Sequence, residues 1–215
     1  MADAGVSLED LDALLLTHLH LDHTGDVAPL LFALRNPDLH RQRPFRIVAP
    51  AAFSELRRGL LGVYGDWVAD PPCGLEVEAW GEQPARLHGW EVIGRPVAHS
   101  AAAHGLRIRS PSGAVLACSG DADECEALVD LGRGADLLIL ECSHPDDRKV
   151  TGHLSPTPCG RIAASAGARR LLLTHFYPGW DPSDALPGVR RSFGGEIALA
   201  ADGMRIDIDS QDLHP

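Results

Sequence analysis

The sequence lacks any apolar run that approaches the roughly 18 residues by which a membrane-spanning helix is recognised. It also lacks the basic start followed by an apolar stretch that marks a secretory leader. These two absences argue against an integral membrane protein. They predict a soluble, cytoplasmic protein that has no membrane partner.

Cysteine pairs of the C-x-x-C type are absent, although such pairs are a common sign of a structural zinc site or a redox pair. The chain has five cysteines, an odd number, scattered along its length (Cys73, Cys118, Cys125, Cys142 and Cys159). This distribution is typical of reduced thiols in a reducing compartment and argues against a disulfide framework.

Positive charge is in short supply, since 19 Lys and Arg stand against 30 Asp and Glu and give a net charge of −11. A protein that grips nucleic acid without sequence preference neutralises its phosphates with many basic side chains. The balance therefore counts against a broad nucleic-acid interface, although it is compatible with a local basic patch.

The composition that remains is globular, with 45% hydrophobic and 23% charged residues in a chain of 215. A chain of this length can bury a core without disulfides or structural metals. No internal repeat, linker or low-complexity segment interrupts it. We therefore predict a single domain over residues 1–215.

Hydrophobic periodicity predicts an α/β chain in which strands and helices interleave. Strands are expected at residues 12–17, 45–48, 75–80, 90–97, 105–109, 114–118, 136–141, 170–174, 196–199 and 204–208, and helices at residues 26–36, 51–62, 123–131, 158–166 and 181–189. Ser-Pro-Ser-Gly at residues 110–113 predicts a hairpin turn within an antiparallel middle. The pattern indicates sheet layers that are covered by helices.

The most informative segment, T-H-L-H-L-D-H-T-G-D at residues 17–26, directly follows the apolar run of residues 14–16. Three histidines and two carboxylates lie within nine positions there. Imidazole and carboxylate groups are the usual ligands of zinc and similar divalent metals. The alternative, a solvated polar loop, does not explain this density at the end of a buried strand, so the segment predicts a metal site.

Three further candidate ligands, His99, Asp121 and His175, each follow a predicted strand. Taken singly, a histidine is more often a surface residue, and an aspartate before a helix is more often a cap. Taken together, they occupy the same kind of position and supply ligands that residues 17–26 lack for a binuclear site. Side chains at the ends of rigid strands are held more accurately than side chains on loops.

The order of these segments resembles the metallo-β-lactamase superfamily over almost the whole chain. The matching segments are H-x-H-x-D-H at residues 18–23, V-A-H at 97–99, S-G-D at 119–121 and L-T-H at 173–175. The resemblance implies an αββα sandwich with two metal ions at one edge of its β layers. It implies that His18, His20 and His99 hold the first metal, that Asp22, His23 and His175 hold the second, and that Asp121 bridges them. The ions would be divalent, with zinc as the first choice and manganese or iron as alternatives.

Two more segments are similar to the ribonuclease Z-like branch of that superfamily. E-C-S at residues 141–143 is similar to its E-A-T element, and G-H-L-S at residues 152–155 is similar to its G-H-x-S/T element. In that branch a Glu and a His act together near the leaving group, and the matching residues here are Glu141 and His153. The simpler alternatives are that Glu141 only ends a strand and that His153 caps a helix.

The sequence departs from this branch in two ways. Ribonucleases Z carry a long arm that grips tRNA, and here the short connection at residues 108–114 leaves no room for it, which counts against tRNA. Family members also begin with several strands before the metal loop, whereas this chain reaches that loop at residue 18. We therefore expect the N-terminal strands of the first sheet to be missing, with an unpaired edge and exposed apolar surface.

The resemblance implies a binuclear metal-dependent hydrolase, and within that class a phosphodiesterase that uses a metal-bridging hydroxide on a small ester or phosphodiester. Asp22 would orient and deprotonate the water, and His153, positioned by Glu141, would protonate the leaving oxygen. Two alternatives stay open. The same site could hydrolyse a lactone, thioester or aryl sulfate, or the chain could be an inactive fragment that only binds metal. A homodimer is also open, since many family members dimerise.

Overall fold

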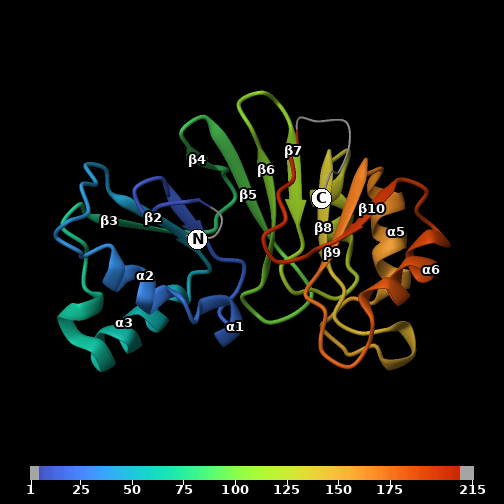
Figure 1. The fold of residues 1–215 in the computed structure, drawn as a ribbon, viewed down its shortest axis with the longest axis horizontal. Coiled ribbons are helices and arrows are strands. Elements are labelled where there is room, and N and C mark those ends of the chain that lie inside the picture. Colours follow the sequence, from blue (N-terminus) through green and yellow to red (C-terminus); the bar gives the residue numbers. More distant parts are fainter. Residues whose placement is uncertain (1–4, 209–215) are drawn as a thin grey trace. The chain divides into compact units, whose positions relative to one another are not determined.

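The computed structural model describes residues 5–208. The chain divides into two compact units, Met1–Gly81 and Glu82–Pro215, here called the N-terminal unit and the C-terminal unit. Each unit has its own sheet (Figure 1). Each also has its own cluster of buried hydrophobic side chains. The single domain predicted for residues 1–215 stays a prediction.

The N-terminal unit contains a parallel sheet of three strands in the order β1-β2-β3. Its elements are β1 (Ala13–Leu15), α1 (Leu21–Thr24), α2 (Val27–Ala33), β2 (Phe45–Ala49), α3 (Phe53–Tyr64), the 3-10 helix η2 (Gly65–Val68) and β3 (Leu75–Ala79). Phe45 and Ile47 on β2 are fully buried with Leu31 of α2 and Phe53 of α3. The two helices therefore pack their apolar side chains against this sheet, and Figure 1 shows both helices on one side of it.

Strand β1 pairs only with β2, so it is an edge strand of the sheet among the described residues. A pocket of about 540 Å³ in this unit is lined by apolar side chains from β1 and its surroundings, among them Leu11, Leu14 and Leu30. The unpaired edge and the open apolar surface expected from the sequence are therefore present in this unit.

The C-terminal unit contains a mixed sheet of seven strands in the order β10-β9-β8-β7-β6-β5-β4. Its strands are β4 (Ala85–Leu87), β5 (Trp90–Pro96), β6 (His104–Arg109), β7 (Val115–Cys118), β8 (Leu137–Glu141), β9 (Arg170–Thr174) and β10 (Glu196–Leu199). Strands β4 to β7 pair antiparallel, and β7 to β10 pair parallel. The continuous apolar runs of β8 and β9 follow from burial on both faces, as is usual for parallel strands.

The helices of the C-terminal unit are α4 (Glu126–Gly132), η3 (Asp146–Arg148), α5 (Pro156–Ala166), η4 (Pro182–Asp184) and α6 (Ala185–Arg190). Ile162 and Ala163 of α5 are buried in one hydrophobic cluster with Leu138 and Leu140 of β8. Among residues 5–208, no helix is long and apolar enough to cross a membrane.

Most of the predicted elements are confirmed, but one predicted strand is wrong. The alternating pattern at residues 204–208 forms no strand in the structure. The buried guanidinium of Arg170 instead donates to the carbonyls of Asp207 and Ile208, at 3.2 and 3.1 Å. A side chain therefore binds backbone groups that a neighbouring strand would have used. The short elements α1 and β4 were missed, because three or four residues show no recognisable period.

Candidate active site

In the N-terminal unit, the metal-loop residues leave the end of β1 and enter the short helix α1. The carbonyl of Leu16 accepts a hydrogen bond of 2.8 Å from the indole of Trp80, which holds the chain where the strand ends. The ring centroid of His18 lies 4.7 Å from that of His20 and 4.0 Å from that of His23. Three of the predicted imidazole ligands are therefore clustered within this unit.

Asp22 belongs to the same cluster, since its Oδ2 lies 3.3 Å from Nε2 of His23. The orientation of the His18 ring is fixed by a hydrogen bond of 3.1 Å between its Nδ1 and the hydroxyl of Thr17. His18 is fully buried, whereas Asp22 is exposed. An exposed carboxylate beside a cluster of imidazoles can act on a water molecule as well as bind a cation.

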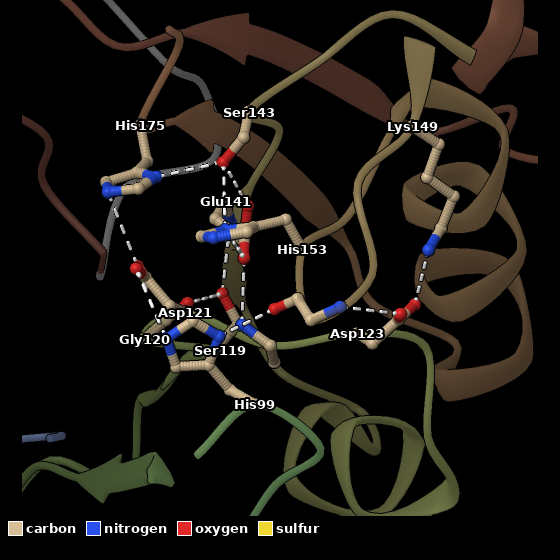
Figure 2. A network of polar contacts seen from close by, with 12 residues as sticks. His99, Ser119, Gly120, Asp121, Asp123, Glu141, Ser143, Lys149, His153 and His175 are labelled. Atoms are coloured by element: carbon tan, nitrogen blue, oxygen red, sulfur yellow. Dashed lines mark hydrogen bonds and ion pairs between the residues drawn. The ribbon is translucent and has the colours of Figure 1, made fainter. Parts of the chain in front are cut away.

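In the C-terminal unit, His99, Asp121 and His175 come from three separate connections and meet at the carboxylate of Asp121. Nε2 of His99 lies 3.8 Å from Oδ2, and Nε2 of His175 lies 3.5 Å from Oδ1 of this carboxylate (Figure 2). Asp121 is 3% exposed. The three residues that were expected to complete the site therefore lie together in this unit.

The protonation of His99 follows from its hydrogen bond. Nδ1 of His99 lies 2.8 Å from the carbonyl oxygen of Gly152, and a carbonyl can only accept. Nδ1 therefore carries a proton, and in the neutral ring the lone pair lies on Nε2, the atom on the side of Asp121. Two imidazoles and a carboxylate that converge in this way form a donor set that fits a divalent metal ion.

The backbone at His175 is unusual. This residue has a φ of 59°, in the left-handed region that residues other than glycine rarely adopt. His175 directly follows β9, so this left-handed conformation turns its side chain out of the strand and toward Asp121. Backbone strain of this kind concentrates at functional sites, where the surrounding structure maintains it.

Glu141 and His153 form a hydrogen-bonded pair in the C-terminal unit. Nδ1 of His153 lies 3.0 Å from Oε1 of Glu141, and the ring of His153 stacks on that of His175 at 5.9 Å between centroids. Glu141 is 1% exposed and also accepts a hydrogen bond of 2.8 Å from the backbone N–H of Ala122. A buried carboxylate that accepts a hydrogen bond from one nitrogen of a partly buried imidazole leaves the other nitrogen able to transfer a proton.

The segment that carries His153 is tied down by residues that sequence reasoning missed. Asp123 accepts hydrogen bonds from the backbone N–H of Gly152 at 3.0 Å and from Nζ of Lys149 at 2.7 Å. Its own N–H donates to the carbonyl of Ala98, one residue before His99. These contacts explain why α4 starts at residue 126 rather than at the predicted residue 123. The position of Asp123, two residues after Asp121, was the available signal.

Because of Glu141, we predict that the free energy of unfolding of the metal-free protein depends on pH. Burial raises the pKa of Glu141 to about 7, against the opposing hydrogen bonds from Ser143 and the Ala122 N–H. Because the folded pKa lies above the usual value of 4.5, the protonated carboxyl stabilises the fold at low pH, and this contribution is lost as the pH rises through about 7.

We expect wild-type protein to lose about 3 kcal/mol of unfolding free energy relative to Glu141→Gln between pH 4.5 and pH 8. Urea unfolding of chelator-treated protein at a series of pH values measures this difference. If the two proteins show the same pH dependence, the carboxyl does not titrate in this range.

The sequence of this chain was compared with protein families and with known proteins. A model of the β-lactamase superfamily domain matches residues 2–176. An uncharacterized protein of Mycobacterium leprae is 38% identical over 205 residues, which cover 91% of this chain and 70% of that protein. A protein named ribonuclease Z from a Mycobacterium species (strain KMS) is 28% identical over 236 residues, which cover 97% of this chain and 81% of that protein.

A solved structure shows the same architecture. The crystal structure of the metallo-β-lactamase fold protein YhfI from Bacillus subtilis matches with a TM-score of 0.78 and 26% sequence identity. The match covers 91% of this chain and 77% of that one.

Proposed function

Because this chain belongs to the metallo-β-lactamase superfamily and is a metal-dependent hydrolase of that group, we propose that it is a binuclear phosphodiesterase of the ribonuclease Z-like type. The observation that carries this proposal is the hydrogen-bonded pair of buried Glu141 and His153 beside His175. The pair matches the two elements by which the sequence resembles that branch.

We propose the ligand assignment that the family pattern implies. His18, His20 and His99 would hold one divalent ion, Asp22, His23 and His175 would hold a second, and Asp121 would serve both. The clustering of the first ligands within the N-terminal unit, and of the last within the C-terminal unit, supports this assignment. Bound there, the two ions would supply Lewis-acid activation of a water molecule and of the substrate oxygen.

The side chains of this site have separate tasks in the proposed reaction. Asp22 accepts a proton from the attacking water. His153 keeps Nδ1–H bonded to Glu141 and donates a proton from Nε2 to the leaving oxygen. The negative charge of Glu141 stabilises the doubly protonated imidazole that this step requires.

Two observations support a small phosphodiester over tRNA as the substrate. Strands β6 and β7 are joined by a tight turn in which the N–H of Gly113 donates to the carbonyl of Ser110 at 3.0 Å. A long nucleic-acid-binding arm has no place in this connection. The net charge of −11 also disfavours a large polyanion.

A substrate panel tests the proposed function. Purified protein is loaded with zinc or manganese and assayed with bis(p-nitrophenyl) phosphate, a phosphomonoester, a lactone and a thioester. We expect hydrolysis of the diester first, and its loss after treatment with a chelator. Activity on the lactone or thioester alone would overturn the phosphodiesterase, and bound metal without any hydrolysis would indicate an inactive metal-binding chain.

A further inference from the structure

Ser143 lies at the centre of the polar network in the C-terminal unit. It is fully buried and lies two residues after Glu141, the last residue of β8. Its Oγ lies 2.5 Å from Oε2 of Glu141, 3.0 Å from Nδ1 of His175 and 3.3 Å from Nδ1 of His153 (Figure 2). One hydroxyl therefore contacts both members of the proton-transfer pair and a proposed metal ligand.

We propose that Ser143 is a positioning residue that sets the tautomer of His175, so that the lone pair of this imidazole lies on Nε2. The inference rests on the proposed function in one respect, namely that the proposed function makes His175 a metal ligand. It assigns to Ser143 a role that neither the motif nor the family match provides.

Counting protons at Ser143 gives the direction of each hydrogen bond. A hydroxyl has one proton to donate and two lone pairs with which to accept. An ionised carboxylate can only accept, so the short contact to Oε2 of Glu141 takes the hydroxyl proton. Ser143 must then accept at its other contacts, and Nδ1 of His175 must carry a proton.

The consequence appears on the opposite side of the imidazole ring. With Nδ1 protonated, Nε2 of neutral His175 has a lone pair, and this atom lies 3.5 Å from Oδ1 of Asp121. This is the same state that the carbonyl of Gly152 imposes on His99. Outer hydrogen-bond partners of metal-binding histidines select the tautomer and the ring orientation in this way.

The backbone around Ser143 keeps its hydroxyl in place. The N–H of Cys142 donates to the carbonyl of Thr174 at 2.8 Å, which joins the ends of β8 and β9. The carbonyl of Ser143 accepts from the N–H of Tyr177 at 3.1 Å and from the indole of Trp180 at 3.2 Å. The segment after His175 is therefore anchored to the residue that orients the His175 ring.

Long-range ¹H–¹⁵N correlation NMR of the metal-free protein tests the proposal without any assay of activity. Spectra are recorded at pH 8.5, and His175→Gln assigns the resonances. We expect wild-type His175 to be in the Nδ1–H form, Ser143→Ala to shift it to a mixture or to the Nε2–H form, and Ser143→Thr to restore the wild-type state.

Ser119→Ala is the matched control, because Ser119 is also a buried serine of this network. Its Oγ donates to the carbonyl of Gly120 at 2.6 Å and accepts from the backbone N–H of Glu141 at 3.0 Å, rather than from an imidazole. It should leave the His175 tautomer unchanged. Zinc titration should show roughly 10- to 100-fold weaker binding at one site in Ser143→Ala, and near wild-type binding in Ser143→Thr.

The outcomes separate this inference from the proposed function. A wild-type His175 in the Nε2–H form, or a Ser143→Ala variant with wild-type tautomer and zinc affinity, overturns the role of Ser143. A wild-type protein that shows the expected tautomer but hydrolyses none of the panel substrates overturns only the proposed function.

Discussion

Replacing Asp121 with Asn should abolish most of the diester hydrolysis and lower the metal content of the purified protein. The carboxylate is buried and lies within 4 Å of both His99 and His175, at 3.8 and 3.5 Å. The amide of Asn has nearly the same shape as the carboxylate of Asp121 but lacks the negative charge that a bridging ligand contributes. We expect the loss in kcat/KM to exceed the roughly 100-fold that follows removal of an outer partner of a metal ligand.

Metal analysis and steady-state kinetics on the same preparation measure this effect. Asp130→Asn is the matched control, because Asp130 is an exposed residue of α4 that pairs with Arg133 on the surface. The control should behave as wild type. Unchanged metal content together with unchanged turnover in Asp121→Asn would falsify the assignment of the bridge.

His153→Ala should produce a loss that depends on the leaving group. A proton from Nε2 of His153 matters most when the departing oxygen is strongly basic, and general acid catalysis of this kind contributes roughly 10²- to 10⁴-fold. A p-nitrophenolate departs readily without a proton. The loss should therefore be large for diphenyl phosphate and small for bis(p-nitrophenyl) phosphate.

The measurement is kcat/KM for a series of aryl phosphodiesters, which should depend more steeply on leaving-group basicity in the variant than in the wild type. His104→Ala provides a control, since Nδ1 of His104 donates to the carbonyl of Ala102, away from Glu141. A uniform loss across the series would assign His153 to binding or structure instead of proton transfer.

The family and the fold were predictable because the relevant signals are local. The H-x-H-x-D-H segment has a spacing that few sequences share, and the apolar runs of β8 and β9 mark buried parallel strands. The resemblance to the metallo-β-lactamase superfamily is confirmed, as is the α/β fold. The predicted strand at residues 204–208 failed because Arg170, far away in sequence, binds its carbonyls.

The sequence by itself determined which side chains are available as ligands and acids, since several imidazoles and carboxylates that each follow an apolar strand are, taken together, typical of a metal site. Only the tertiary structure decided how those groups are protonated and held. The tautomer of His99 depends on the carbonyl of Gly152, and that of His175 on the hydroxyl of Ser143. Partners of this kind are far apart along the chain and carry no distinctive pattern, because hydrogen bonding depends on distance and direction in space.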